Sequence, residues 1–266
     1  MTAIAVTIAG SDSGGGAGIQ ADLKTFSALG VYGASVITAL TAQNTLGVQG
    51  IHDVPPAFVE QQIDSVFSDL AVDAVKIGML SQPAIIETVA EGLERHRATQ
   101  VVLDPVMVAA SGDRLLAPQA VNALRQVLLP KALLVTPNLP EAAAILDEPL
   151  AQDERAMCRQ AERILAPGPR AVLVKGGHGT GHESTDILVD AQGVRRFTAP
   201  RLDTRNTHGT GCTLSSAIAA GLAKGLSLDD AIAMAKSFIS AAIGASSQLQ
   251  IGRGHGPVHH FHAYWS

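Results

Sequence analysis

Residues 206–212 are the segment best suited to phosphate chemistry. They read Asn-Thr-His-Gly-Thr-Gly-Cys and precede an Ala-rich helical pattern. Unpaired N–H groups and the positive end of that helix would converge on an anion, so Gly209 and Gly211 predict a phosphate site. Cys212 would lie in the first helical turn, where the positive helix end lowers a thiol pKa and favours a thiolate that accepts a proton. A flexible helix start and a cysteine that only packs are the alternatives.

Two carboxylates and a lysine follow predicted strands and could act on a metal-bound nucleotide. Asp104 and Glu141 are plausible Mg²⁺ ligands, directly or through water. Asn138 and Glu141 also have the spacing of a helix cap and its reciprocal third residue, so a structural capping role stays open. Lys175 directly follows a Val-Leu-Val strand and could reach a nucleotide phosphate, although an ordinary surface lysine fits the same position.

The first glycine-rich loop, residues 10–18, does not complete either of two common nucleotide-binding motifs. Residues 16–21 formally fit the GxGxxA pattern of dinucleotide-binding folds, but the second strand ends in Thr41-Ala42-Gln43, without the acidic residue that holds the ribose. No GxxxxGK[ST] segment occurs, which excludes a Walker-type phosphate loop. The glycines predict either a tight turn or backbone amides that approach a small substrate.

Two further groups of residues predict no chemistry. Four histidines between residues 255 and 262 fit no metal-binding spacing, and a packed tail or subunit interface with the neighbouring aromatic residues explains them better. Cys158 lies mid-helix among charged residues and is assigned no role. The two cysteines are far apart in unlike sequences, so no disulfide framework is expected.

The candidate residues need a scaffold that brings strand ends together. Short β-branched runs predict strands at residues 4–9, 34–40, 74–77, 100–103, 132–135 and 171–174, with a hairpin between residues 184–189 and 194–199. Helical spacing predicts helices at residues 57–70, 83–96, 118–128, 153–165, 211–224 and 228–247. This alternation favours a three-layer α/β/α fold with a mostly parallel sheet. Polar and glycine residues follow the carboxyl ends of the strands, which predicts one shared site at that edge.

Composition limits the function classes. The 266 residues include 19 basic and 24 acidic side chains, a net charge of −5 that excludes a strongly basic nucleic-acid binder. At about 150 residues per domain the length allows one or two domains, and the absence of a linker favours a single domain over residues 1–266. No apolar run reaches the roughly 20 residues of a membrane span, and the N-terminus lacks the basic flank of a secretory signal. A cytoplasmic protein is expected.

Taken together in order, these motifs closely resemble the ribokinase-like superfamily, and within it the bacterial hydroxymethylpyrimidine/phosphomethylpyrimidine kinases of thiamine biosynthesis. The resemblance covers the chain almost end to end. The segments that carry it are residues 7–12, 14–24, 41–45, 76–80, 104–106, 136–141 and 206–212.

The resemblance implies ATP-dependent phosphorylation of 4-amino-5-hydroxymethyl-2-methylpyrimidine and then of its monophosphate, with Mg²⁺, by a homodimer. It implies that Gln43 binds the substrate through its amide and that the substrate pocket is shaped or lined by Gly10, Asp22, Met79 and Val106. It also implies that the nucleotide is bound by Lys175, Asn138 and Thr210, and the metal by Asp104 and Glu141. Many relatives carry Asp where this chain has Cys212.

The predicted reaction is an in-line transfer. The substrate hydroxyl, oriented by the pocket and Cys212, attacks the γ-phosphate of Mg·ATP while Lys175 and the amides of residues 209–212 stabilise the phosphate charge. The glycine-rich residues 176–182 are expected to close over the nucleotide.

Three other functions stay open from the sequence. A pyridoxal or pyridoxine kinase of the same superfamily is the nearest, because pyridoxal shares a ring nitrogen, a methyl and a hydroxymethyl group with the pyrimidine; Gln43 and Cys212 favour the pyrimidine. A non-catalytic pyrimidine-binding sensor would bind without forming ADP. A NAD oxidoreductase would bind nicotinamide.

Replacing Cys212 tests the predicted mechanism. We expect Cys212→Ala to lower kcat by about 10²- to 10⁴-fold, the usual contribution of a general base, without unfolding the chain. Steady-state kinetics with circular dichroism measures both effects, and near-full activity in a folded variant would remove Cys212 from the mechanism.

Overall fold

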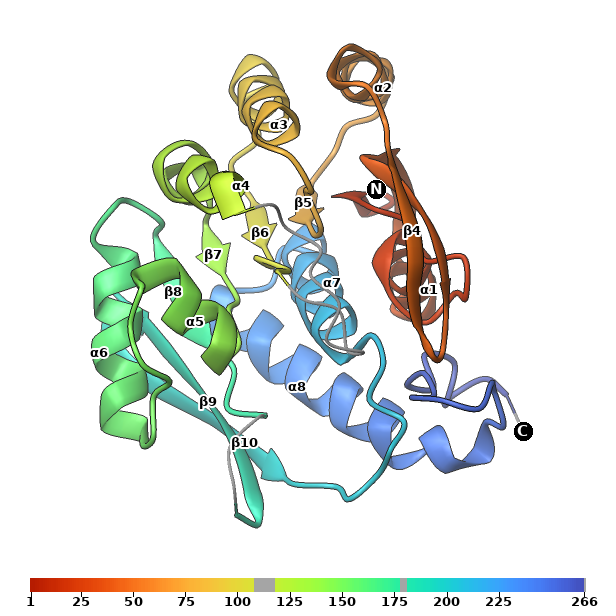
Figure 1. The fold of residues 1–266 in the computed structure, drawn as a ribbon, viewed down its shortest axis with the longest axis vertical. Coiled ribbons are helices and arrows are strands. Elements are labelled where there is room, and N and C mark those ends of the chain that lie inside the picture. Colours follow the sequence, from red (N-terminus) through yellow and green to blue (C-terminus); the bar gives the residue numbers. More distant parts are fainter. Residues whose placement is uncertain (108–117, 178–180, 266) are drawn as a thin grey trace.

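The central element of the fold is an eight-stranded sheet. In this computed structural model, which describes residues 1–107, 118–177 and 181–265, the strands lie in the order β10-β9-β8-β7-β6-β5-β1-β2 (Figure 1). They are β1 (Ile4–Ala9), β2 (Tyr32–Ile37), β5 (Ala74–Ile77), β6 (Val101–Leu103), β7 (Leu134–Val135), β8 (Ala171–Val174), β9 (Glu183–Asp190) and β10 (Gly193–Pro200). All neighbours from β2 to β8 pair in parallel, and β9 and β10 add an antiparallel edge. The predicted three-layer α/β fold is confirmed.

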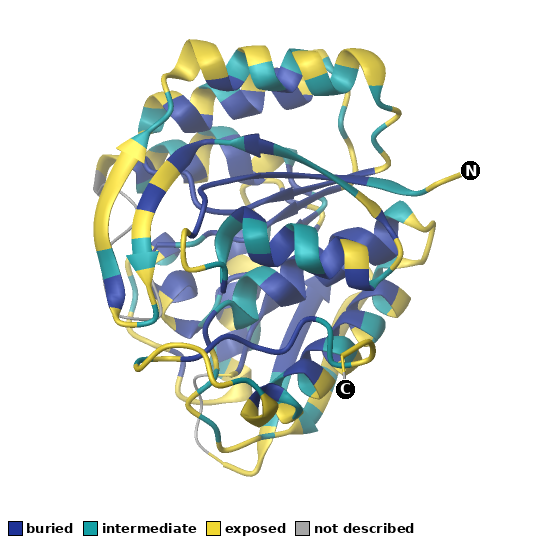
Figure 2. Ribbon diagram, turned by 90° about the vertical axis from the view of Figure 1, so that its right-hand side faces the viewer, coloured by how far each residue is buried: buried dark blue, intermediate teal, exposed yellow. Residues whose placement is uncertain are grey.

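Helices cover both faces of this sheet (Figures 1 and 2). One layer holds α2 (Pro56–Asp69), α3 (Pro83–Arg95), α4 (Pro118–Ala123), α5 (Leu139–Leu146) and α6 (Glu154–Leu165); the other holds α1 (Gly18–Ala28), α7 (Thr210–Ala223) and α8 (Leu228–Gly244). Alternate strand residues enter opposite layers: Val6 packs with the first and Ala5 with the second. Two apolar cores result, one on each face of the sheet.

None of the helices within the described ranges has the length and apolar character needed to cross a membrane.

The second predicted strand is only partly right. Residues 34–40 do not form one strand, because β2 ends at Ile37 and a new strand, β3 (Ala39–Asn44), begins after Thr38. Thr38 marks the change of direction: its N–H donates to the carbonyl of Ala9 and its hydroxyl to the carbonyl of Met79. A continuous β-branched run does not reveal that its pairing partner changes partway along.

β3 instead forms a separate antiparallel pair with β4 (Gly47–Asp53), a strand that the sequence did not predict. We call this two-stranded sheet the flap. In Figure 1 it extends from the start of α2 to the C-terminal segment. Gln43 and Asn44 therefore belong to the flap and not to the end of a strand in the large sheet.

The other expected strand ends do meet at one edge. β1, β5, β6, β7 and β8 are mutually parallel, so the residues that follow them share the carboxyl edge of the sheet. The prediction of one shared edge is confirmed for these five strands, and the flap reaches the same edge by a different path.

A buried ion pair ties α1 to the middle of the sheet. Lys76, in β5, has no exposed surface, and its Nζ lies 2.9 Å and 2.8 Å from the two carboxylate oxygens of Asp22. Burial alone would lower the pKa of Lys76, but the charge and hydrogen bond of Asp22, together with the charge of Asp104, outweigh it and raise the pKa. Thr7 and Ser216 donate to the same carboxylate, at 2.6 Å each.

Removal of the lysine should be costly. We expect Lys76→Met to lower the free energy of unfolding by about 3–5 kcal/mol, because Asp22 is left as a buried charge without a cation. Urea unfolding measures this. Lys131→Met is the matched control: its partner Glu94 is largely exposed, so the stability should hardly change. Equal midpoints for the two variants would contradict the assignment.

Candidate active site

The first glycine-rich loop packs directly against the start of α7. Gly18 (φ 56°) and Gly209 (φ 81°) both adopt left-handed backbone conformations that glycine tolerates. A side chain on Gly209 would also collide with the carbonyl oxygen of Gly16. The two glycine segments singled out in the sequence are therefore brought into contact, although almost 200 residues separate them.

The flap holds Gln43 over this loop. The Gln43 backbone N–H donates to Ser13 Oγ at 2.8 Å, and Ser13 Oγ donates to the Gln43 carbonyl at 2.9 Å. Thr41 Oγ1 donates to the carbonyl of Ser11 at 2.9 Å and lies 3.3 Å from Gln43 Oε1. The amide of Gln43 is half-buried at the rim of the carboxyl edge, where a small polar ring could reach it.

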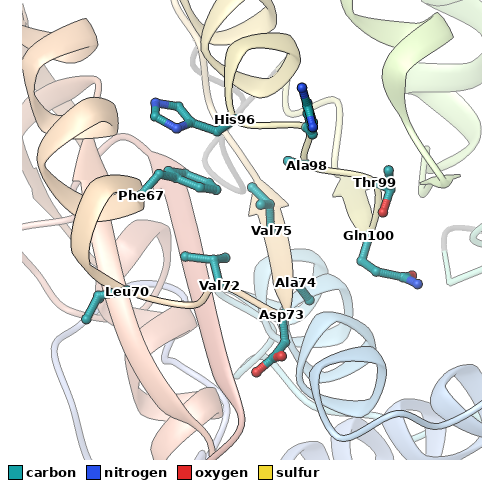
Figure 3. A pocket seen from close by; sticks show the side chains of 11 residues that line it. Phe67, Leu70, Val72, Asp73, Ala74, Val75, His96, Ala98, Thr99 and Gln100 are labelled. Atoms are coloured by element: carbon teal, nitrogen blue, oxygen red, sulfur yellow. The ribbon is translucent and has the colours of Figure 1, made fainter.

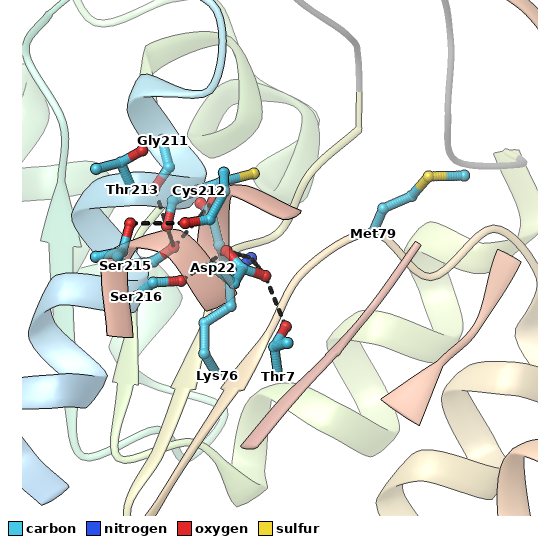
Figure 4. A network of polar contacts seen from close by, with 12 residues as sticks. Thr7, Asp22, Lys76, Met79, Gly211, Cys212, Thr213, Ser215 and Ser216 are labelled. Atoms are coloured by element: carbon cyan, nitrogen blue, oxygen red, sulfur yellow. Dashed lines mark hydrogen bonds and ion pairs between the residues drawn. The ribbon is translucent and has the colours of Figure 1, made fainter. Parts of the chain in front are cut away.

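Three other expected substrate residues lie near this rim. Gly10 and Met79 adjoin, since a Cβ on Gly10 would lie 3.1 Å from the Met79 sulfur. Val106 is half-buried, and its N–H donates to the carbonyl of Asp104 at 2.8 Å. Figure 4 shows Met79 on the loop after β5, apart from the polar network around Asp22.

Asp22 occupies a different position from these three residues. Both of its carboxylate oxygens are taken up by Lys76, Thr7 and Ser216, and the side chain is fully buried. In Figure 4 this group lies next to Cys212. Asp22 therefore shapes the site from within the core instead of presenting a free oxygen to a ligand.

The acidic and basic residues predicted for metal and nucleotide form one cluster. Lys175 Nζ lies 2.7 Å from Asp104 Oδ1 and 3.9 Å from Glu141 Oε2. Thr136 and Ser215 donate to Asp104 at 3.1 Å and 3.4 Å. All of these groups are at the carboxyl edge, on or just beyond β6, β7 and β8 or on α7.

Burial changes the protonation of this cluster. Burial, with a smaller contribution from the nearby charge of Asp104, raises the pKa of Glu141 to about 7, although Lys175 opposes the change. Burial would lower the pKa of Lys175, but Asp104 and Glu141 reverse this and raise it. Lys175 is therefore a permanent cation at neutral pH, held between two carboxyl groups.

Asn138 and Glu141 form the helix cap that their spacing allowed. The Glu141 N–H donates to Asn138 Oδ1 and the Asn138 N–H donates to Glu141 Oε2, both at 2.8 Å. This capping box starts α5 and fixes the carboxyl group of Glu141 beside Lys175. The structural alternative is thus confirmed, and it places Glu141 where a ligand role would need it.

The start of α7 offers free backbone donors. The N–H of Thr213 donates to the carbonyl of Gly209 at 2.8 Å. Thr210 donates twice to the carbonyl of Thr207, once from its N–H and once from its hydroxyl. Within the described part of the chain, no acceptor contacts the N–H groups of Gly211 and Cys212. A Cβ on Gly211 would lie 3.2 Å from Lys175 Nζ and 3.5 Å from Asp104 Oδ2. The helix end and the charged cluster are therefore adjacent.

The expected lowering of the Cys212 pKa is wrong. Burial raises the pKa of this thiol to about 11, with Asp22 and Asp104 adding to the increase, although Lys76 and the N–H of Gly18 act against it. The loss of hydration thus outweighs the positive helix end, which alone would have favoured the thiolate. Cys212 is a neutral, half-buried thiol in this state.

The donor set suits Mg²⁺ held partly by water. Among the residues that the structure describes, no cluster of three or more His, Cys, Asp or Glu side chains is arranged to hold a metal ion. Mg²⁺ in phosphate sites usually needs only one or two carboxylates and keeps several waters. Asp104 and Glu141 provide two buried carboxyl groups beside the start of α7, and the charge of Asp104 contributes to the raised pKa of Glu141, which favours a further cation.

A cavity of about 190 Å³ lies at the opposite edge of the sheet (Figure 3). Its walls come from the chain before β5 and before β6, including Asp73, His96 and Gln100. It is remote from the carboxyl edge and shares no residue with the cluster above.

Residues 178–180 of the expected closing segment lie outside the described residues, as do residues 108–117, which follow Val106.

Sequence reasoning missed the partners that hold the site residues in place. Lys76, Thr136, Ser215 and the pair Asp12 and His208 were not assigned roles, although several lie in the recognised motifs. Lys76 carried a usable signal, because a charged residue in an otherwise apolar strand requires a buried partner. Nothing local indicated that His208 would meet Asp12.

Comparisons with known proteins point to one family. A family model described as phosphomethylpyrimidine kinase matches residues 12–259. The chain is 62% identical to a Rhizobium meliloti hydroxymethylpyrimidine/phosphomethylpyrimidine kinase, over 100% of this chain and 99% of that protein. It is 57% identical to the Escherichia coli enzyme of the same name, over 98% of each.

Solved structures give the same result for the fold. A phosphomethylpyrimidine kinase from Clostridium difficile is 46% identical, with a TM-score of 0.80 over 90% of this chain and 99% of that one. Pyridoxal kinase from Staphylococcus aureus, in complex with AMP-PCP and pyridoxal, is 34% identical, with a TM-score of 0.91 over 99% and 95%.

The raised pKa of Cys212 predicts its reactivity. Only the thiolate is alkylated, so a pKa of about 11 should make the iodoacetamide rate of a Cys158→Ser variant rise about tenfold per pH unit from pH 7 to 10. Mass spectrometry after brief pulses measures the rate, and glutathione provides the ordinary thiol for comparison. A rate that levels off below pH 9 would show that Cys212 is instead activated.

Proposed function

Because the chain belongs to the phosphomethylpyrimidine kinase family, we propose that its carboxyl-edge site transfers phosphate from ATP first to 4-amino-5-hydroxymethyl-2-methylpyrimidine and then to the resulting monophosphate. The activity is that of a hydroxymethylpyrimidine and phosphomethylpyrimidine kinase of thiamine biosynthesis. The observation that carries the proposal is the position of the Lys175–Asp104 pair against Gly211, where α7 begins with free N–H groups. A fixed cation and free amides meet there.

The phosphate side of the reaction depends on preorganised charge. Lys175 Nζ and the N–H groups of Gly211 and Cys212, with Gly209 allowing the tight approach, would hold the transferred phosphoryl group. Asn138 and Thr210 would contact the nucleotide from the starts of α5 and α7. These donors are held by the fold before ATP binds, so little reorganisation is needed during transfer.

Asp104 and Glu141 would hold Mg²⁺, through its waters where their own hydrogen bonds persist. When bound, the ion would neutralise phosphate charge and orient the β- and γ-phosphates. Lys175 supports this arrangement because its Nζ, 2.7 Å from Asp104 Oδ1, holds that carboxyl group in place.

The substrate side depends on the flap and the first glycine loop. Gln43 would hydrogen-bond the aminopyrimidine through its amide, and Gly10, Met79 and Val106 would supply close, mostly apolar walls. Asp22 would act indirectly, through Lys76. The hydrogen bonds between Ser13 and Gln43 support this role, since they fix the backbone that carries the amide.

Cys212 would orient the substrate hydroxyl at the start of α7. Because its neutral thiol already carries a proton, it would not serve as the base, and the hydroxyl proton would leave late, to an oxygen of the transferred phosphoryl group or to water. This fits a loose transition state, in which positioning and charge neutralisation dominate.

A second activity, on pyridoxal, is favoured by one observation. The pyridoxal kinase structure that holds pyridoxal and AMP-PCP superposes over 99% of this chain, so the same scaffold accommodates a pyridine with a hydroxymethyl group. Gln43 and Cys212 favour the pyrimidine as the main substrate.

Further parts of the proposal concern organisation. We treat residues 1–266 as one kinase domain, supported by the continuous central sheet. A homodimer is supported by apolar side chains that the flap and the start of α2 leave in solvent, namely Leu40, Leu46, Ile51 and Phe58. A cytoplasmic location follows from the use of ATP in a bacterial biosynthetic pathway.

Product-resolved phosphorylation tests the function. Purified protein with Mg·ATP is offered hydroxymethylpyrimidine, its monophosphate and pyridoxal separately, and ADP and each product are followed by chromatography. Conversion of both pyrimidines is expected. Reaction of pyridoxal alone would make the vitamin B6 activity primary, and pyrimidine binding without ADP formation would identify a sensor.

A further inference from the structure

A side-chain contact joins the two glycine segments of the site. Asp12 follows β1 and His208 precedes α7, 196 residues later in the chain, yet His208 Nε2 lies 2.8 Å from Asp12 Oδ2. Both side chains are nearly inaccessible, with 2% of Asp12 and 10% of His208 exposed. The two residues therefore form a buried bridge between the substrate side and the phosphate side.

The carboxylate of Asp12 is fully occupied by the loop that it starts. Oδ1 accepts from the N–H of Gly14 at 2.8 Å, and Oδ2 accepts from Gly16 at 3.0 Å and Ala17 at 2.8 Å, in addition to His208. Burial alone would raise the pKa of Asp12, but the His208 hydrogen bond and the loop amides hold it below its ordinary value. Because both oxygens already accept hydrogen bonds and the side chain is only 2% exposed, Asp12 organises the loop and does not bind substrate.

The ordered loop in turn contacts the reacting groups. The N–H of Gly18 points to the Cys212 sulfur, and the carbonyl of Gly16 lies against Gly209. A side chain on Gly16 would overlap the His208 ring. A shift of the loop relative to α7 would thus move Cys212 and the phosphate-binding amides away from the acceptor hydroxyl.

The C-terminal segment holds His208 from the other side. His208 N–H donates to the carbonyl of Gly256 at 3.1 Å, and Val258 N–H donates to the His208 carbonyl at 3.3 Å. Further along, His260 Nε2 lies 3.0 Å from Thr213 Oγ1 in α7. Figure 1 shows this segment running beside the tip of the flap, where the N–H of His255 donates to the carbonyl of Thr45 at 3.0 Å.

From this geometry we infer that His208 and Asp12 are positioning residues for phosphoryl transfer: their bridge, held by residues 255–260, fixes the acceptor-side loop against the phosphate-binding start of α7. The inference rests on the proposed kinase function. It also assigns a structural role to the histidine-rich tail, whose spacing does not fit a metal site: the tail supports the bridge.

Variants of His208 test the bridge. His208→Ala removes the donor to Asp12 and should lower kcat for hydroxymethylpyrimidine by about 10- to 100-fold, because a displacement near 1 Å costs on that order. The KM for the pyrimidine should stay within about threefold, since Gln43 is held by the flap. His208→Gln keeps an N–H that reaches Asp12 and should restore kcat to within about threefold of the wild type. If His208→Ala does not fold, His208→Asn, whose amide falls short of Asp12, replaces it.

A matched control comes from the opposite edge of the sheet. His96 Nε2 lies 2.7 Å from Asp64 Oδ1, so His96→Ala removes the same kind of pair far from the site and should leave kcat unchanged. Two results would overturn the inference: kcat of His208→Ala within twofold of the wild type, or His208→Gln as impaired as His208→Ala.

Hydrogen exchange gives a readout that does not need activity. Amides of residues 14–17 and of Thr213, which donate hydrogen bonds in the wild type, should exchange faster in His208→Ala than in the wild type or in His96→Ala, and unchanged exchange would refute the bridge. A wild-type protein without kinase activity would instead refute the proposed function, and the exchange comparison would still decide whether the bridge orders the two loops.

Discussion

Buried charges constrain this active site more than any other factor. Burying a charge without a partner that neutralises it lowers the stability of the fold by roughly several kcal/mol. Lysine–aspartate pairs provide such partners in and around the site, and each joins two separate elements. The pairs are Lys76–Asp22, Lys175–Asp104 and Lys236–Asp186. If either member of a pair moved, its partner would be left as an unneutralised charge in an apolar environment. The positions of the site's charges are therefore fixed before any ligand binds.

The same burial decides the protonation of Cys212 and Glu141. Cys212 remains a thiol and Glu141 has a pKa of about 7, in both cases chiefly because water is excluded. The site therefore does not rely on a strong base. In the proposed reaction it would rely on Lys175, on helix amides and on close placement of the acceptor, which is what phosphoryl transfer through a loose transition state requires.

The two halves of the chemistry come from different parts of the fold. Phosphate-side groups lie at the ends of parallel strands and at the start of α7, whereas Gln43 comes from the flap, which is not part of the large sheet. Acceptor choice can thus change on the flap while the phosphate machinery stays constant, which agrees with the presence of both pyrimidine and pyridoxal kinases among proteins of this fold. The bridge between Asp12 and His208 would keep the two halves in register.

The sequence alone determined the alternation of strands and helices, the shared carboxyl edge and most of the chemically active residues, because periodicity, caps and glycine loops are local properties. The sequence predicted that Glu141 takes part in a helix cap, but it did not predict that the Glu141 carboxyl group lies beside Lys175. Only the tertiary structure decided that residues 34–40 divide between two sheets, that Lys76 meets Asp22, and that the Cys212 pKa rises instead of falling. Strand partners, buried ion pairs and desolvation all depend on which distant segments exclude water together, and no local pattern in the chain encodes that.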